Sequence, residues 1–224
     1  MGSFVCLRNV RKTYHMGEVS IHAVDGMNFE IEEGEFVVIV GPSGAGKTTV
    51  LNILGGMDTC TEGEVLVDGK DISRYTERQL TAYRRDDIGF VFQFYNLIQN
   101  LTALENVELA MQICREPLKA EEVLADVGLA DRMNNFPAQL SGGEQQRVAI
   151  ARAVVAGPKL ILADEPTGNL DSKNGKEVMD LLKELNQEGT TIVMVTHSQK
   201  DASQAQRTID LFDGQIVSDV KNEL

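Results

Sequence analysis

The sequence predicts an α/β fold with a mainly parallel core sheet, an antiparallel β subdomain and a helical subdomain. Four short apolar runs consist almost entirely of Val, Ile, Leu and Phe, which is typical of parallel strands buried on both faces. These runs are 36–40, 88–92, 160–163 and 192–195. The first run ends in a glycine-rich segment, and segments with helical periodicity lie between the runs. Polar residues that follow such strands gather at one edge of the sheet.

Length and composition set the limits of what the chain does. Its 224 residues, 42% of them hydrophobic, are enough for one such domain with its subdomains. The 21 basic and 34 acidic residues give a net charge of -13, which argues against contact with nucleic-acid phosphates or anionic lipid. No run approaches the roughly 20 apolar residues that span a bilayer, and no signal peptide is recognisable, so we expect a cytosolic chain. Three scattered cysteines are expected to be reduced packing residues.

The N-terminal segment, residues 4–32, predicts the antiparallel subdomain. It shows short alternating runs that are broken at Gly17 and Gly26. Tyr14 lies within it, and the residues alone favour a half-buried strand aromatic over a functional one.

A phosphate-binding loop follows the first core strand. Residues 36–49 read FVVIVGPSGAGKTT and contain the pattern G-x-x-x-x-G-K-T. Glycines let the backbone N–H groups point inward at a polyphosphate, which Lys47 also reaches. Thr48, in the first turn of the next helix, is placed to ligate Mg²⁺. A glycine-rich turn without a ligand is the alternative, but strand, loop, Lys-Thr and helix occur in the order that the motif requires.

The middle of the chain predicts a small helical subdomain, approximately residues 94–157. It follows a helix at 49–54, a strand in GEVLVDG, a polar helix at 77–85 and the run that ends on Gln93. The next residues, FYNLIQNLT, are too apolar for a merely solvated loop, so they form either a partner surface or packing beneath the following helices. Helical patterns then run from Leu104 to Asn134 with a break at 116–117.

A capped helix begins at Ser141 in LSGGEQQRVAIARAVVAG. Ser141 and Glu144 have the S-x-x-E spacing of a capping box. The two glycines between them leave backbone N–H groups bare, which favours an anion site, although a plain capped helix remains the alternative.

The segment LILADEPTGNLD places Asp164 and Glu165 at the end of a buried strand. Adjacent carboxylates are costly there unless a cation or a proton-transfer role retains them, and a surface acidic turn fits the preceding apolar run poorly. A helix at 172–188 and the strand TIVMVT lead to His197, which by itself is more often structural. Residues 207–220 form a closing hairpin, with an Asp213–Gly214 turn, that we expect to be scaffold.

The carboxyl ends of these four strands bring a complete set of groups for phosphate chemistry to one edge. Mg²⁺ would bridge two phosphates from Thr48 and Gln93, with Asp164 holding it directly or through water. Glu165 would then activate the attacking water, and His197 would orient the terminal phosphate. It is this convergence that favours function for Gln93 and His197.

LSGGEQQ, the phosphate (Walker A) loop, LILADEP, GNLD and His197 together resemble the nucleotide-binding domain of ABC transporters, a P-loop NTPase, over essentially the full chain. Within that family, NILGGMD, IGFVFQ and ADEPTGNLD look like the branch of lipoprotein-release, macrolide-export and antimicrobial-peptide-resistance ATPases. There are two small departures: Glu144 stands where many relatives have Gln, and Phe94 where relatives often repeat Gln.

The resemblance implies one ABC domain over residues 1–224 that binds ATP and Mg²⁺. Tyr14 would stack on adenine, Gln93 would be the Q-loop glutamine, and Asp171 would end the D-loop. The signature Ser141–Glu144 would cap the ATP of a second copy, so that two chains sandwich two ATP molecules. The implied nucleotide-binding residues are Tyr14, Gly41, Pro42, Ser43, Gly44, Ala45, Gly46, Lys47, Thr48, Thr49, Ser141, Gly142, Gly143, Glu144 and Asp171.

The resemblance also implies a membrane partner. The loop after Gln93 would receive a permease at the cytoplasmic face of the plasma (inner) membrane, without insertion of this chain. Hydrolysis would then drive export or release of a lipoprotein, peptide or drug. The alternatives are a soluble ABC-type ATPase acting on nucleic acid or ribosomes, which usually carries two cassettes, a coiled-coil insertion or basic surfaces, and a signalling ATPase that transmits mechanical work without cargo.

Overall fold

The core of the molecule is a six-stranded sheet. The structure is a computed structural model, and it describes residues 3–17 and 19–222. The strand order is β10-β9-β3-β8-β7-β6. The strands are β3 (Phe36–Val40), β6 (Ile88–Phe92), β7 (Leu160–Asp164), β8 (Thr191–Thr196), β9 (Arg207–Phe212) and β10 (Gln215–Lys221). All are parallel except β10, which pairs antiparallel with β9. The mainly parallel core is therefore confirmed.

The closing hairpin contributes more than scaffold. Its turn forms as predicted, with positive φ at both Asp213 and Gly214. Its first strand, however, pairs in parallel with β3 and so belongs to the core sheet. Within β9 only Ile209 and Leu211 are buried, an alternation that in sequence is typical of a half-exposed hairpin strand. The alternation therefore did not predict that this strand pairs with β3.

A second sheet is antiparallel throughout and has the order β2-β1-β4-β5. Its strands are β1 (Val5–Met16), β2 (Val19–Ile31), β4 (Glu62–Val67) and β5 (Lys70–Asp71). The predicted break at Gly17 is confirmed, whereas Gly26 does not end a strand. It lies inside β2 with φ 69, beside a shift in the β1–β2 register. The sequence predicted a break at Gly26, but the structure accommodates this residue in an irregularity of the strand pairing.

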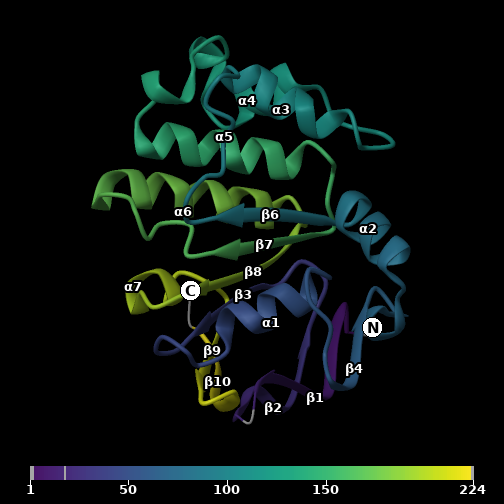
Figure 1. Cartoon of the computed structure of the whole chain (residues 1–224). Helices are drawn as coiled ribbons and strands as arrows, with labels where there is room; N and C mark the ends of the chain where they lie inside the picture. The colour runs from purple at the N-terminus through teal and green to yellow at the C-terminus, as the bar shows by residue number, and fades with distance from the viewer. Residues whose placement is uncertain (1–2, 18, 223–224) are drawn as a thin grey trace.

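Helices cover both faces of the core sheet. They are α1 (Lys47–Leu54), α2 (Glu77–Asp86), α3 (Ala103–Met111), α4 (Ala120–Asp126), α5 (Gly142–Val154), α6 (Ser172–Gln187) and α7 (Gln199–Ala202). Short 3-10 turns lie at Ile72–Arg74, Ala130–Arg132 and Pro137–Gln139. Figure 1 shows α5 and α6 along one side of the sheet, α3 and α4 beyond α5, and α1 between the core sheet and the antiparallel sheet.

Two hydrophobic clusters lie on opposite faces of the core sheet. On β3, Val38 and Val40 pack into the cluster with α3 to α6, and Val37 and Ile39 pack into the cluster with α1 and the antiparallel sheet. The side chains of β3 therefore alternate between two hydrophobic cores, which explains its unbroken apolar sequence. Within residues 3–17 and 19–222, no helix is both long enough and apolar enough to cross a lipid bilayer.

We predict that Gly55→Ala destabilises the fold. Gly55 ends α1, and a Cβ there would overlap the Phe90 ring and lie 3.0 Å from Leu162 Cδ1. Overpacking of this kind costs roughly 1–3 kcal/mol, which urea unfolding measures. Gly175→Ala is the matched control, because its Cβ would lie 3.7 Å from Thr167 Cβ within α6, and it should stabilise by roughly 0.5–1 kcal/mol. Equal stability of the two variants would contradict the packing described here.

Candidate active site

The phosphate-binding loop joins β3 to α1 and requires glycine at two positions. Gly41 has φ 154 and Gly46 has φ 99, both in the range that favours glycine. A Cβ at Gly41 would overlap the Leu211 carbonyl oxygen, and one at Gly46 would overlap that of Ala23. The loop therefore curls against β9 and β2 at distances that no side chain permits.

Lys47 occupies the inside of this loop. Its Nζ donates to the carbonyl oxygens of Gly41 at 2.7 Å and Pro42 at 2.9 Å, and the residue is 9% exposed. The side chain thus fixes a positive charge within the ring of backbone groups. Ala45 is buried, and its N–H donates to Pro42 O. Gly41 and Pro42 also line a neighbouring hollow with Phe212.

A hollow of about 640 Å³ opens beside the loop and is lined by seven of the fifteen expected nucleotide-binding residues. Its lining consists of Tyr14, Ile21, His22, Ala23, Ser43, Gly44, Gly46, Lys47, Thr48, Thr49, Asp164, Glu165 and Asp213. The antiparallel sheet, the phosphate loop and the end of β7 therefore form one concave surface.

Tyr14 stands at the rim of this hollow in a fixed orientation. It is 38% exposed, and its hydroxyl donates to Asp58 Oδ2 at 2.7 Å. Lys12 Nζ lies 5.0 Å from the ring centroid and 2.6 Å from Asp58 Oδ1. Partial burial and the Asp58 hydrogen bond raise the pKa of Tyr14, so it acts as a neutral donor. A planar aromatic ring thereby lines the hollow.

Asp164 and Glu165 form the acidic side of the hollow. Asp164 ends β7, and its Oδ2 lies 3.5 Å from Thr48 Oγ1. Burial, and then the neighbouring charge of Glu165, raise the pKa of Asp164. A carboxylate in this position is stabilised by a cation, which agrees with the expectation from the sequence.

Glu165 is held in a strained conformation by the neighbouring strand. Its φ of 47 is left-handed, and the next residue is Pro166, which disfavours that region further. Its N–H donates to Val195 O at 2.9 Å, and its Oε2 accepts from Thr196 Oγ1 at 2.9 Å. His197 Nδ1 lies 2.9 Å from Oε1. The structure therefore brings the expected base and the expected histidine into direct contact.

Gln93 points away from the hollow toward the loop that follows β7. Its Nε2 donates to Asn169 Oδ1 at 3.1 Å, and Asn169 Nδ2 donates back to Gln93 O at 3.2 Å. A Cβ on Gly168 would lie 2.8 Å from the Gln93 amide nitrogen. Gln93 is thus joined to the segment 168–171 through Asn169 and is not among the residues that line the hollow with Thr48 and Asp164.

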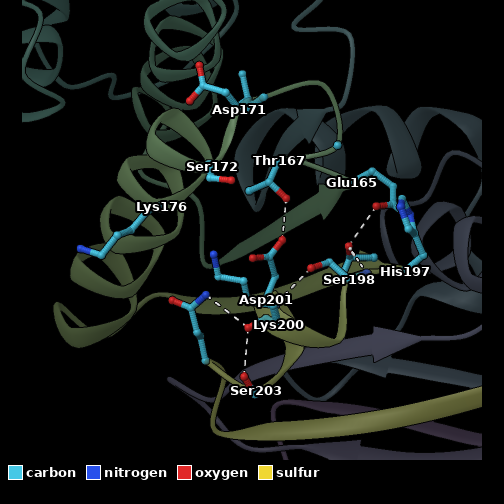
Figure 2. Close-up of a pocket in the computed structure, with 15 residues that line it drawn as sticks. Glu165, Thr167, Asp171, Ser172, Lys176, His197, Ser198, Lys200, Asp201 and Ser203 are labelled. Carbon is cyan, nitrogen blue, oxygen red and sulfur yellow. Dashed lines mark hydrogen bonds and ion pairs between the residues drawn. The ribbon is translucent and has the colours of Figure 1, made fainter.

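A second hollow, of about 440 Å³, lies on the other side of Glu165 and His197. Figure 2 shows it between the start of α6 and the segment around α7, where the Thr167 hydroxyl donates to Asp201 Oδ2 at 2.7 Å. Asp171 caps α6 by accepting from Asn174 N at 2.9 Å, and this backbone hydrogen bond lowers the pKa of Asp171. Glu165 lines both hollows, whereas His197 lines this second hollow and not the one beside the phosphate loop.

The expected signature residues stand apart from the phosphate loop. Ser141 caps α5, since Glu144 N donates to Ser141 Oγ at 3.3 Å and Ser141 N donates to Glu144 Oε2 at 2.7 Å. The predicted capping box is confirmed. None of the residues from Ser141 to Glu144 lines either hollow. The chain alone does not bring this helix end to its own phosphate site.

Sequence reasoning missed several residues that hold the site together. Thr196 ends a predicted strand, and Asn169 and Gln146 lie within the motifs GNLD and LSGGEQQ. The sequence signal for these residues was therefore the motif or strand that contains them. Asp58 ends the segment NILGGMD, but its contact with Tyr14 gave no signal, because the two residues are 44 positions apart. Such long-range partners emerge only from the fold.

A family model described as "ABC transporter" matches residues 24–168, which include the phosphate loop, Gln93, the capped α5 and the acidic pair. The chain belongs to the ABC transporter family. The resemblance in its motifs is thereby confirmed, and so is the cassette fold that it implied.

The chain is similar over most of its length to several named ABC proteins. It is 47% identical to the lipoprotein-releasing system ATP-binding protein LolD of Syntrophus aciditrophicus, over 95% of this chain and 98% of that protein. It is 46% identical to the macrolide export ATP-binding/permease protein MacB of Brucella melitensis, over 95% of this chain but only 34% of that protein. A dimeric post-hydrolysis structure of the cassette MJ0796, from Methanocaldococcus jannaschii, bound to ADP and Pi superposes with a TM-score of 0.88. That structure is 49% identical and is matched over 98% of this chain and 99% of its own.

We predict that Thr196→Val destabilises the cassette although it preserves side-chain shape. The Thr196 hydroxyl is 1% exposed, donates to Glu165 and accepts from Ser198 N at 3.1 Å. Losing it removes the partner of the part-buried Ser198 N–H and one partner of Glu165, so the free energy of unfolding should fall by roughly 1–3 kcal/mol in chemical denaturation. Thr81→Val, on the exposed face of α2, is the control and should change it by less than about 0.5 kcal/mol. Equal effects would show that the Thr196 hydrogen bonds add nothing.

Proposed function

We propose that this cassette is the ATP-binding and ATP-hydrolysing subunit of an ABC membrane transporter complex. The observation that carries the proposal is the single hollow in which the phosphate loop faces Asp164 and Glu165. A phosphate cradle and a carboxylate that is able to accept a proton are what nucleotide hydrolysis requires.

Nucleotide binding follows from the groups that line the hollow. The loop N–H groups and the start of α1 favour the phosphates, and Lys47 exchanges its two carbonyl partners for phosphate oxygens. The Tyr14 ring, fixed by Asp58, offers a stacking surface for adenine at the opposite rim. The remaining expected contacts are Ser43, Gly44, Gly46 and Thr49.

The residues present fit Mg²⁺. Thr48 and Asp164 place a hydroxyl and a carboxylate 3.5 Å apart, and oxygen ligands are what this ion prefers. The raised pKa of Asp164 reflects an environment that a cation would relieve. Gln93 would complete the set after leaving Asn169. When bound, Mg²⁺ neutralises charge on the outer phosphates.

Hydrolysis depends on Glu165 as the proton acceptor. Its carboxylate is oriented by Thr196 on one oxygen and His197 on the other, so its position is set before substrate arrives. A water held by this carboxylate would be activated for attack on the terminal phosphate, and His197 would orient that phosphate.

The active unit is a homodimer. The signature residues Ser141–Glu144 lie away from the phosphate hollow of their own chain, and the 49% identical cassette MJ0796 forms a dimer. We infer that the bare N–H groups at the start of α5 close on the ATP of a second copy, with Asp171 beside that junction. Residues 94–157 would move as a helical subdomain in this closure.

We predict that Glu165→Gln lowers kcat for ATP hydrolysis by roughly 10²–10⁴-fold, because the proton acceptor is lost. ATP affinity should change little, and the variant should accumulate as a dimer with ATP. A phosphate-release assay and light scattering measure the two effects.

The matched control for this experiment is Glu184→Gln on the exposed face of α6, which should keep the wild-type rate. EDTA should abolish the wild-type rate and Mg²⁺ should restore it. Equal rates for wild type and Glu165→Gln would refute the assigned role, and hydrolysis that persists in EDTA would refute the metal.

A permease is the proposed partner. In the loop after Gln93, Leu97 is buried whereas Phe94 is 72% exposed, so the loop both packs internally and presents an apolar surface. The name of the MacB relative joins an ATP-binding part and a permease in one chain. Here the permease would be a separate subunit, with this chain peripheral on the cytoplasmic face of the plasma membrane. The cargo class would be a lipoprotein, peptide or drug for export or release.

We predict that Glu165→Gln, purified with ATP from detergent-solubilised native membranes, brings a membrane permease with it. Blocked hydrolysis should hold the complex closed, and mass spectrometry identifies the partner. Adding Phe94→Ser should reduce recovery of that partner without reducing ATP-driven dimerisation. Recovery of nucleic acid or ribosomal proteins alone, while a control transporter complex stays intact, would favour the soluble ATPase instead.

A further inference from the structure

Gln146 is a buried amide at the centre of the molecule. It lies on α5, is 0% exposed, and its Nε2 donates to Pro166 O at 2.8 Å and to Phe92 O at 3.2 Å. Both partners are carbonyl oxygens, which only accept, so the amide has one possible orientation. Both of its N–H groups are therefore used.

These two carbonyls flank the residues assigned to hydrolysis. Phe92 directly precedes Gln93, and Pro166 directly follows Glu165. The β6–β7 pairing ends with Phe92 opposite Asp164, so Pro166 lies beyond the last paired residue. Gln146 thus continues the link between the two strands at the point where the sheet stops.

The remaining atom of the amide, Gln146 Oε1, is buried and has no hydrogen-bond partner in the described part of the chain. An unpaired buried polar atom costs roughly 1–3 kcal/mol. The amide is kept in place by its two carbonyl partners in spite of that cost.

Two arginines of helix α5 make further contacts, one with the loop after Gln93 and one with helix α6. Arg152 donates to Tyr95 O at 2.8 Å and to Asn96 O at 2.5 Å, two residues with left-handed backbone in the loop after Gln93. Arg147 pairs with Glu177 of α6 at 2.8 Å. The capped start of α5, at Ser141, lies less than two turns before Gln146 along one continuous helix.

We propose that Gln146 is a positioning residue that couples the start of α5 to Gln93 and Glu165. The inference rests on the proposed function, in which the start of α5 contacts the ATP of the second copy whereas Glu165 serves the ATP of its own chain. A shift of α5 on nucleotide contact is passed through the Gln146 amide to both strand ends. Occupancy of one site thereby sets the hydrolytic geometry of the other.

The test compares Gln146→Met with Asn186→Leu in the full-length chain. Each substitution approximately preserves side-chain shape and removes an amide that donates to two backbone carbonyls. Asn186 donates to Gly34 O at 2.8 Å and Thr190 O at 3.0 Å, away from both hollows, so it reports the cost of losing such an amide. Thermal stability, ATP binding, kcat and the Hill coefficient for ATP hydrolysis are measured for each.

We expect both variants to lose Tm, but only Gln146→Met to change the kinetics. Its kcat should fall roughly tenfold or more, and its Hill coefficient should fall toward about 1, with binding of a fluorescent ATP analogue within about twofold of wild type. Asn186→Leu should keep kcat within about twofold and the wild-type Hill coefficient. Equal kcat losses in the two variants, or an unchanged Hill coefficient in Gln146→Met, overturn the proposal.

A second measurement does not depend on turnover. In a Glu165→Gln background, ATP should slow hydrogen exchange at residues 142–154 and 165–171 together, and Gln146→Met should retain the first effect and lose the second. Gln146→Asn, which keeps an amide too short for both carbonyls, replaces Gln146→Met if that variant does not fold. Equal protection of both segments in the variant overturns the coupling.

Failure of the proposed function is distinguishable from failure of this inference. A wild-type chain without Mg²⁺-dependent ATPase activity would overturn both. Wild-type hydrolysis with matching kinetics in Gln146→Met and Asn186→Leu would overturn the inference alone.

Discussion

The site depends on a sheet that is dry on both faces. Since β3, β7 and β8 alternate between two hydrophobic clusters, a polar side chain has no room along their length. Functional groups emerge only where a strand ends, and the parallel direction puts those ends on one edge. The phosphate loop, the acidic pair and His197 meet there for that reason, although they are far apart in the chain.

The same edge carries a strained backbone conformation at Glu165. Glu165 adopts a left-handed conformation that costs of order 1–3 kcal/mol, and it does so because β8 supplies partners on its backbone and side chain. A carboxylate that is fixed in this way loses little entropy when a reaction begins. Stability elsewhere in the core allows local strain to serve positioning.

A feature of the fold or the site was predictable when consecutive residues of the sequence encode it. The phosphate loop, the α5 cap and the ends of β6, β7 and β8 are encoded in consecutive residues, and they were predicted correctly. The position of β9 in the core sheet was not predicted. Its alternating burial is typical both of a hairpin strand and of a strand near the edge of a core sheet. The Asp58–Tyr14 and Gln146 contacts join distant segments, so no window of sequence contains them. Gln93, placed near the metal by its strand end, instead pairs with Asn169.

Lys47 helps to hold the phosphate loop in its shape. Its ammonium group donates to two carbonyl oxygens of the loop. These hydrogen bonds within the chain hold the loop in shape. A phosphate that binds there, as proposed above, would replace these two carbonyl oxygens as partners of Lys47. A loop that hydrogen bonds already hold in place loses little ordering entropy on association. The cassette is ready for nucleotide before it meets either a second copy or a membrane.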